Sequence, residues 1–241
     1  MAGRLFAIGD IHGCARELEA LLNGLGLVRG DRVLCVGDYI DRGPASRAVI
    51  DQLLDLERRP GIETVFLRGN HEDMCLAYLG RPGHWGEAWF VNGGGFTLRS
   101  YGLDPRATPA QAEAALPPGH LTFLERLHIR HVADDHLFVH AGIRPDLSLA
   151  AQDEEDLMWI REEFITAPHS LPYTVIFGHT PQRAVLVDLP YKIGIDTGCV
   201  YGGRLTALEL PDYVVHQVGW GERTVRQSRV PTNAAVARPT A

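Results

Sequence analysis

Polar clusters of the kind that bind metal ions follow five apolar segments of this 241-residue chain. They are GDIHG at residues 9–13, GDYIDRG at 37–43, GNHE at 69–72, HAG at 140–142 and GHT at 178–180. A single cluster of this kind is typical of a turn, and a single histidine on an apolar strand is typical of a hydrogen-bonded core residue. Carboxylates next to buried strands must be paired or bound to metal. Five clusters together therefore predict a metal site that acts on substrate.

An α/β fold is expected to position these clusters. Strands at 4–9, 32–36 and 63–67 alternate with helices at 14–25, 46–57 and from about 71. This alternation predicts right-handed βαβ units around a parallel sheet, and such folds place their sites at the carboxyl ends of the strands. Further segments predict a helix at 153–164 and a second, largely antiparallel set of strands at 128–133, 136–140, 174–177, 184–188, 192–195, 204–209 and 213–218.

We interpret residues 1–225 as a single domain, because no repeat or linker divides them. Residues 80–119 are rich in Gly, Pro and Ala and predict a helical insertion near the site. Within it, TPAQ at 108–111 has the threonine cap, first-position proline and glutamine of a helix start. Residues 226–241 contain no aromatic or acidic side chain and predict a flexible tail.

The composition excludes several classes of protein. With 23 basic and 30 acidic residues the net charge is −7, which argues against general binding of nucleic acids or anionic membranes. No apolar run approaches the roughly 20 residues of a membrane span, and no signal-peptide pattern is present. The four cysteines, Cys14, Cys35, Cys75 and Cys199, form no C-x-x-C pair, so neither a zinc ribbon nor a redox motif is expected. We expect a cytoplasmic protein.

The five clusters, in this order, resemble the motifs of the calcineurin-like metallophosphoesterases. More narrowly, they resemble the phosphoprotein phosphatase family in its small bacterial and phage forms. The resemblance extends from Arg4 to Leu210. It implies an α/β metallophosphoesterase fold, in which two mixed β-sheets pack as a sandwich and α-helices flank them in a four-layer α/β/β/α arrangement.

The resemblance further implies two divalent metal ions. The first would be bound by Asp10 and His12, both would be bridged by Asp38, and the second would be completed by Asn70, His140 and His179. Oxygen and nitrogen ligands without thiolate suit Mn, Fe or Zn, and the resemblance favours Mn²⁺ among them. A hydroxide that bridges the metals would attack phosphorus directly, so no phosphoenzyme intermediate is expected.

The same resemblance assigns roles to side chains around the metals. His71 would be the general acid, and Asp41 would accept one ring N–H, which fixes the tautomer and raises the pKa of His71. Arg42 and Arg161 would bind the phosphoryl oxygens, a task that suits the planar guanidinium, and Asn70 would also lie against the phosphate. Arg144 is a weaker candidate. Among the aromatic residues of the insertion, Trp85, Trp89 and Phe90 are interpreted as its core more readily than as an aromatic wall for substrate, and Tyr201 is given no catalytic role.

Single positions within the motifs differ between branches of the family and narrow the range of expected substrates. The last cluster lacks the second histidine of Gly-His-x-His, as in the phosphoprotein phosphatases. Asp41 and Glu72 favour that branch over symmetrical diadenosine tetraphosphate hydrolases, which typically carry alanine and aspartate there. We therefore predict a protein serine/threonine phosphatase that also accepts phosphotyrosine. The alternatives are a symmetrical dinucleoside polyphosphate hydrolase and a metal-dependent binding protein without turnover. The sequence leaves the oligomeric state open.

Overall fold

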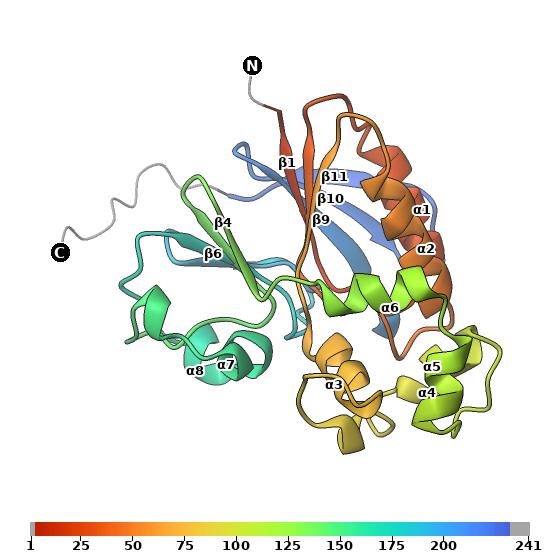
Figure 1. Cartoon of the computed structure of the whole chain (residues 1–241). Helices are drawn as coiled ribbons and strands as arrows, with labels where there is room; N and C mark the ends of the chain where they lie inside the picture. Colours follow the sequence, from red (N-terminus) through yellow and green to blue (C-terminus); the bar gives the residue numbers. More distant parts are fainter. Residues whose placement is uncertain (1–2, 232–241) are drawn as a thin grey trace.

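The computed structural model describes residues 3–231, and its strands form two mixed β-sheets (Figure 1). The six-stranded sheet has the order β11-β10-β9-β1-β2-β3, and the five-stranded sheet has the order β4-β5-β6-β8-β7. The strands are β1 (Leu5–Ile8), β2 (Arg32–Cys35), β3 (Glu63–Phe66), β4 (Arg130–Ala133), β5 (His136–Val139), β6 (Thr174–Phe177), β7 (Leu186–Asp188), β8 (Lys192–Gly194), β9 (Arg204–Leu210), β10 (Val214–Gly219) and β11 (Arg226–Arg229).

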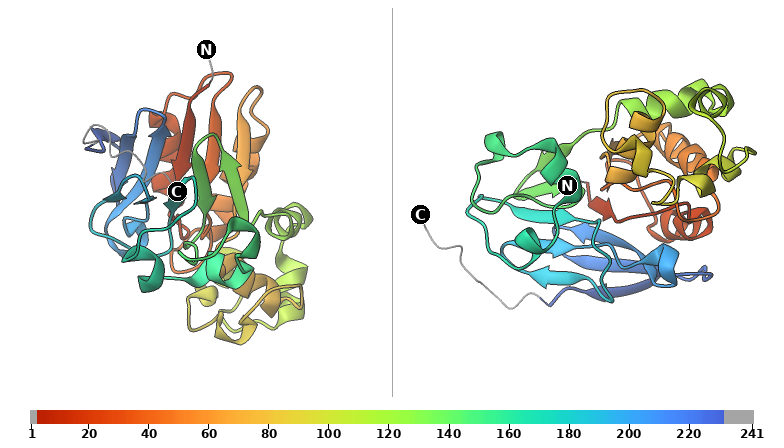
Figure 2. Two further views of the ribbon diagram at one scale, coloured as in Figure 1. Left: turned by 90° about the vertical axis from the view of Figure 1, so that its left-hand side faces the viewer. Right: turned by 90° about the horizontal axis from the view of Figure 1, so that it is seen from below.

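Helices cover the outer face of each sheet (Figures 1 and 2). The α-helices are α1 (Ala15–Gly24), α2 (Ser46–Glu57), α3 (Asn70–Tyr78), α4 (Gly94–Ser100), α5 (Pro109–Ala115), α6 (Pro118–Glu125), α7 (Glu154–Trp159) and α8 (Glu162–Ile165). Three short 3₁₀ helices are η1 (Gly86–Ala88), η2 (Leu149–Ala151) and η3 (Cys199–Tyr201).

The core has three apolar layers because strand side chains alternate between the two faces of a sheet. In β1, Phe6 belongs to the cluster that includes α1 and α2, whereas Leu5 belongs to the cluster between the sheets. In β5, Phe138 lies between the sheets and Leu137 packs with α7 and α8. The predicted four-layer α/β/β/α sandwich is therefore confirmed.

The strand pairing brings the predicted site segments to one edge. β1, β2 and β3 are parallel neighbours, as are β5, β6 and β8, so their carboxyl ends point the same way within each sheet. The prediction of a separate antiparallel set is wrong in part. β9 and β10 pair antiparallel but join β1 in the first sheet, because β9 hydrogen-bonds along the free edge of β1.

Two local predictions are also corrected. The helix expected over 153–164 is two helices, α7 and α8, because the backbone of Ile160 is extended (ψ 144°) and its side chain is buried in the third core layer. Residues 226–229 belong not to a tail but to β11, which pairs antiparallel with β10. Main-chain pairing needs no apolar side chains, and buried Val230 holds the segment against the inter-sheet core. The rest of the expected tail, residues 232–241, lies outside the described residues.

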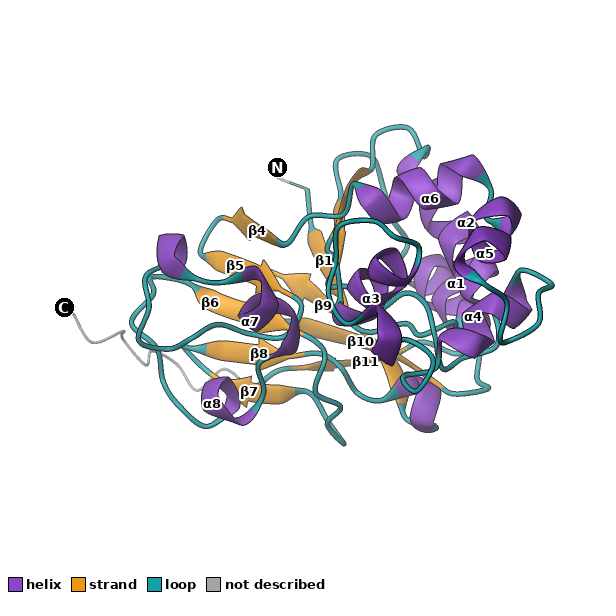
Figure 3. Ribbon diagram, turned by 60° about the horizontal axis from the view of Figure 1, so that its bottom comes forward, coloured by secondary structure: helices purple, strands orange, loops and turns teal. Residues whose placement is uncertain are grey.

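Residues 80–119 contain η1, α4, α5 and the start of α6, which lie beside α3 and α2 (Figure 3). The TPAQ segment forms a capping box: the Thr108 hydroxyl accepts the Gln111 N–H, and the Gln111 amide oxygen accepts the Thr108 N–H. Among the described residues, no helix has the length and apolar character that a membrane crossing requires.

A buried ion pair at the start of the first sheet predicts a pH-dependent part of the stability. The Asp31 carboxylate accepts bonds from the Arg4 and Val28 backbone N–H groups and from the Arg4 guanidinium, at 2.6 Å for the closest. Burial raises the pKa of Asp31, but these partners outweigh it and hold the pKa below its ordinary value. The stabilisation is therefore complete above the ordinary pKa of about 4 and is lost as the pH falls through the lower, folded-state pKa.

We expect Asp31→Asn to lower the free energy of unfolding by about 1–2 kcal/mol at pH 7, because the half-buried donors lose a charged acceptor. Urea unfolding of both proteins at pH 7, 5 and 3.5 measures this difference, which should shrink toward the acidic end. A difference that stays constant over the three pH values would contradict the assignment.

Candidate active site

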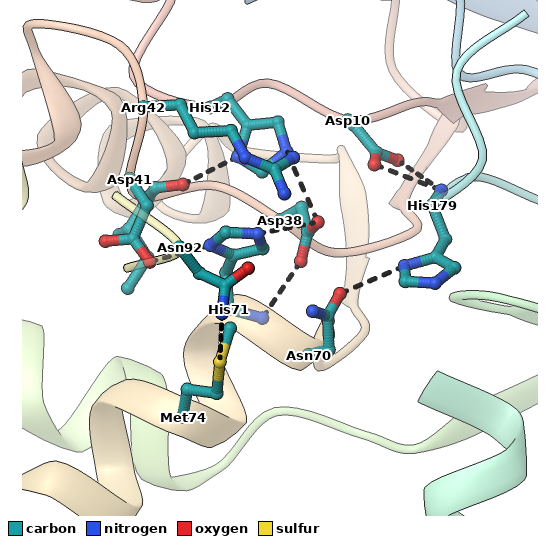
Figure 4. Close-up of polar contacts among 12 residues, drawn as sticks. Asp10, His12, Asp38, Asp41, Arg42, Asn70, His71, Met74, Asn92 and His179 are labelled. Carbon is teal, nitrogen blue, oxygen red and sulfur yellow. Dashed lines mark hydrogen bonds and ion pairs between the residues drawn. The ribbon is translucent and has the colours of Figure 1, made fainter. Parts of the chain in front are cut away.

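Five strand ends converge on one cluster of side chains, which Figure 4 shows in part. Asp10 follows β1 and His179 follows β6, and the two sheets join here because the His179 N–H lies 3.1 and 3.0 Å from the two Asp10 carboxylate oxygens. A Cβ at Gly178 would lie 2.0 Å from Asp10 Oδ1, so only glycine permits this approach.

Asp38, after β2, lies at the centre of the cluster and is 1% exposed. Its Oδ2 lies 3.3 Å from His12 Nε2 and 3.9 Å from His71 Nε2, and its Oδ1 lies 3.4 Å from His140 Nε2. Burial alone would raise the pKa of this carboxyl, but His140, His71 and His12 hold it well below its usual range. Asp38 is therefore an anion that faces imidazole nitrogens on both sides.

Backbone carbonyls fix the tautomers of two of these histidines. His12 Nδ1 lies 2.8 Å from Ile40 O, and His140 Nδ1 lies 2.9 Å from Val36 O. A carbonyl oxygen only accepts, so each Nδ1 carries the hydrogen and each neutral ring presents a lone pair on Nε2. Burial lowers the pKa of His140 to about 4, which keeps that ring neutral. His140 Nε2 is therefore preset as a metal ligand. Burial lowers the pKa of His12, but the charge of Asp38 outweighs burial and raises it, so His12 Nε2 can bind a metal once it loses its proton.

Asn70 joins the third strand end to the second sheet. It is the first residue of α3, and its Oδ1 lies 3.0 Å from both His140 Nε2 and His179 Nδ1. Because His140 Nε2 bears a lone pair, this amide oxygen and that nitrogen are two acceptors that face each other without a hydrogen between them. Such an arrangement is favourable when a cation lies between the acceptors.

The carboxylates of the cluster repel one another. Burial, Asp196 and Asp38 raise the pKa of Asp10 well above its usual value. Asp196 itself is 5% exposed, and burial raises its pKa as well. Cations bound among these groups would offset both the repulsion and the cost of burial.

The residues present fit divalent cations. Two groups place potential ligand atoms within 4.8 Å of one another: His12, Asp38 and His71, and Asp38, His140 and His179. His179 Nε2 and His71 Nε2 are buried with no hydrogen-bond partner among residues 3–231. Neutral imidazole, carboxylate and amide oxygen without thiolate are the donor set of Mn, Fe or Zn rather than of copper or calcium.

Backbone strain is concentrated at these residues. Of the eight non-glycine residues with positive φ in the described chain, five belong to the site: His12 (44°), Asp38 (53°), Asp41 (70°), Arg42 (63°) and His179 (64°). Each costs about 1–3 kcal/mol and persists only where the surroundings enforce it. Evolution retains such conformations at sites whose side chains must converge, so the strain points to function.

The structure places His71 against Asp41, both fully buried. His71 Nδ1 lies 2.7 Å from Asp41 Oδ2, and the carboxylate also accepts bonds from Trp89 Nε1 (2.8 Å) and the Thr97 hydroxyl (2.6 Å). Nδ1 therefore carries a hydrogen, and Nε2 is directed toward Asp38. Sequence reasoning expects Asp41 to raise the pKa of His71. Burial outweighs the charges of Asp38 and Asp41, so the pKa lies below the ordinary histidine value.

Trp89 positions this pair from the insertion, which predicts an effect of Trp89→Phe. The phenyl ring fills most of the volume but leaves Asp41 without one N–H donor. We expect kcat to fall about 10-fold, since outer partners of this kind are typically worth 10–100-fold. Trp85→Phe is the matched control, because the Trp85 side chain is 50% exposed. Steady-state kinetics measure the effect, and an unchanged kcat in the Trp89 variant would contradict the positioning role.

Glu72 shapes the loop that carries Asp38. Its buried carboxylate accepts the backbone N–H groups of Asp38 (2.9 Å), Tyr39 (2.8 Å), Ile40 (3.2 Å) and Gly69 (3.0 Å). Burial and the Asp38 charge raise the pKa of Glu72 to about 8, and the N–H donors oppose that shift. Glu72 thus fixes two of the strand-end loops relative to each other.

The arginines differ in their relation to the cluster. Arg42 Nη1 lies 2.7 Å from His12 Nε2, and its guanidinium lies over the ring of Tyr201, 5.6 Å from the centroid. Arg161 is exposed at the break between α7 and α8, near enough that its charge helps to lower the pKa of His179, after burial and His140. Arg144 instead forms a two-bond ion pair with Asp156, at 2.8 Å each.

Sequence reasoning missed several residues at this edge. Asp196 follows a sixth buried strand, β8, and this recurrence of an acid after an apolar segment was the available signal. Trp89 and Thr97 had no signal, since both come from an insertion without a motif. Cys14 and Cys199, distant in sequence, meet at buried Glu17 with ligand atoms within 4.8 Å. A hydrogen bond with Cys199 and burial raise the pKa of the Cys14 thiol, which favours its unreactive protonated form.

The model of the calcineurin-like phosphoesterases matches residues 3–221, so the chain belongs to that family. Its members use divalent metals, in agreement with the donor set described above. With hydrolase relatives along most of its length, the chain is a phosphoric ester hydrolase.

Two similar proteins are named asymmetrical bis(5'-nucleosyl)-tetraphosphatase PrpE. The one from Geobacillus thermodenitrificans is 31% identical over 236 residues, and that from Bacillus thuringiensis is 29% identical over 232. Each alignment covers 85% of this chain and 89% of the relative.

Solved structures agree with the family. One described as a candidate diadenosine tetraphosphatase has a TM-score of 0.69 and 26% identity, and the match covers 91% of this chain and 94% of that one. A cold-active protein tyrosine phosphatase (TM-score 0.61, 19% identity, 94% and 79% covered) shares the fold. So does a serine/threonine phosphatase from Saccharomyces cerevisiae (TM-score 0.61, 14% identity, 99% and 82% covered).

Proposed function

We propose that this phosphoric ester hydrolase is a metal-dependent hydrolase of dinucleoside polyphosphates that cleaves its substrate asymmetrically. The support is the pair of relatives with 29% and 31% identity over most of both chains, whose names carry that activity. The likeness to the protein phosphatases, at 19% and 14% identity, supports the fold alone. The proposal therefore puts dinucleoside polyphosphates before phosphoproteins, whereas the sequence alone favoured phosphoproteins. It also proposes asymmetrical cleavage in place of the symmetrical cleavage considered from the sequence.

The observation that carries the hydrolytic role is the orphaned Nε2 of His71, buried beside Asp38 and without a partner in the described chain. We propose that this atom holds the proton that the leaving oxygen receives. Asp41 holds the ring by Nδ1, and the negative charge of a bound phosphate favours the protonated form. Arg42 and Arg161 would bind non-bridging phosphoryl oxygens.

The proposed metal ligands are Asp10, His12, Asp38, Asn70, His140 and His179. Bound divalent cations supply Lewis acidity toward the phosphoryl oxygens and a water nucleophile that is deprotonated near neutral pH. We propose Mn²⁺ as the metal, with Fe and Zn as the alternatives that the same donors accept.

A second candidate is a phosphoprotein phosphatase. It is favoured by Asp41 and Glu72, because the residue types at these two positions distinguish the phosphoprotein phosphatases from the symmetrical dinucleotide hydrolases. In the structure Asp41 binds His71, and Glu72 binds four backbone N–H groups of the site loops.

A comparison of kcat/KM decides between the two. The Mn²⁺-loaded protein is assayed on diadenosine tetraphosphate and on phosphoserine, phosphothreonine and phosphotyrosine peptides. The proposal expects a higher kcat/KM for the dinucleotide, with AMP and ATP as products rather than two ADP. A higher value for any phosphopeptide would overturn the proposal in favour of the second candidate, and a product of two ADP would overturn the asymmetry.

A further inference from the structure

A cavity of about 560 Å³ lies beside the site and is lined by Tyr201, whose ring contacts Arg42. One wall is the segment after His179, from Pro181 to Arg183, and the others are residues 197–204 and the turn after β10. Its volume lies in the usual range for small-molecule sites. None of the residues with a proposed role in hydrolysis lines this cavity.

Two aromatic side chains line this cavity and face solvent. Tyr201 is 60% exposed and Trp220 is 44% exposed. Large aromatic groups left open in a concave site are suited to stacking on a flat ring, and every nucleobase offers such a face.

Three arginines line the same cavity: Arg183, Arg204 and Arg226. Arg226 pairs with Glu222 at 3.1 Å, but Arg183 and Arg204 have no ion pair within residues 3–231. The whole chain carries a net charge of −7, so a basic pocket is a local exception to its surface. Guanidinium groups with free donors are suited to phosphate oxygens.

The cavity is joined to the reaction centre by side-chain contacts. Tyr201 lines the cavity, its ring packs against Arg42, and Arg42 contacts His12 at 2.7 Å. On the other wall, Pro181 lies two residues after His179. A ligand that has one phosphate at the metal ligands can therefore continue past Arg42 and Tyr201 into the cavity.

We propose that this cavity binds the nucleoside end of the dinucleoside polyphosphate, with the base stacked on Trp220 and Tyr201 and the adjoining phosphates on Arg183 and Arg204. This inference rests on the proposed function. A nucleotide combines a flat aromatic ring with several successive anionic groups. The aromatic side chains of the cavity match the ring, and its arginines match the anionic groups. A phosphopeptide brings a single phosphate to the site and leaves the two unpaired arginines without partners.

The test compares Trp220→Ala and Arg204→Ala with Phe96→Ala. Phe96 is the matched control because it is also 44% exposed but lines a different cavity, beside α4. For the Trp220 variant we expect the ratio of kcat/KM on diadenosine tetraphosphate to kcat/KM on p-nitrophenyl phosphate to fall about 10-fold, as loss of one stacking contact predicts. Trp220→Phe keeps a stacking face and should restore most of the ratio.

The remaining outcomes separate the cavity assignment from the proposed function. If the wild type hydrolyses the dinucleotide and the ratio is unchanged in both cavity variants, or falls equally in Phe96→Ala, the cavity assignment is wrong while the proposed function stands. If the wild type does not hydrolyse it, the proposed function fails, and calorimetry with ADP tests the cavity separately. A dissociation constant raised about 10-fold by Trp220→Ala then supports the cavity, and an unchanged one overturns it.

Discussion

Replacement of His71 by asparagine is expected to lower kcat about 10²–10⁴-fold while the protein stays folded and binds metal. The buried Nε2 of His71 lies 3.9 Å from Asp38 and has no hydrogen-bond partner in the described residues, so its loss removes the proposed proton donor and none of the proposed metal ligands. Asparagine retains a polar group near Asp41 and limits the structural cost.

The leaving group separates proton donation from a general structural effect. p-Nitrophenyl phosphate has an acidic leaving group that needs little protonation, whereas an alkyl phosphate ester such as a phosphoserine peptide has a basic leaving group that needs more. The loss should therefore be smaller on p-nitrophenyl phosphate. His120→Asn is the matched control, because His120 is also buried and hydrogen-bonded, to Tyr101 and Asp51, but lies outside the site. Equal losses on both substrates would contradict the role of His71 as proton donor.

Replacement of Asp38 by asparagine is expected to abolish binding of both metal ions and to lower kcat/KM by about 10³-fold, the effect of several kcal/mol of lost Lewis-acid stabilisation. The two oxygens of Asp38 face both groups of histidines, His12 on one side and His140 on the other. Asparagine has nearly the same shape, so the loss reports the charge and the second oxygen rather than the packing.

Calorimetry with Mn²⁺ measures the binding directly, and Asp31→Asn is the matched control at a buried aspartate far from the site. That variant is expected to bind metal as the wild type does. Normal stoichiometry in Asp38→Asn would show that this carboxylate does not bridge two ions.

Local patterns predicted the βαβ order and the polar clusters at the strand ends, and the resemblance of those clusters to a known family implied the layers of the fold and the proposed metal ligands. Short apolar segments such as Leu5–Ile8 and Thr174–Phe177, each followed by glycine, favour buried strands, and both are strands. The parallel βαβ order then brings Asp10, Asp38 and Asn70 to one edge.

Other features depend on contacts that no local pattern encodes. β9 and β10 join β1 through pairing across more than half of the chain, and only the folded sheet shows it. Trp89 reaches Asp41 from an insertion whose sequence lacks any motif, so its indole was interpreted as core; it is buried, but it also donates a hydrogen bond to the site. The cavity around Trp220 is assembled from three separate loops, and for that reason composition alone could not reveal a basic pocket on an acidic chain.

The most direct test of the account is a titration of metal-free protein with Mn²⁺, followed at the same time by calorimetry and by hydrolysis of p-nitrophenyl phosphate. We predict two ions bound per chain, negligible hydrolysis before the ions are added, and full activity only when both are bound. Hydrolysis by the chelator-treated protein as fast as by the loaded protein would contradict the account, as would a loaded wild type no faster than His71→Asn.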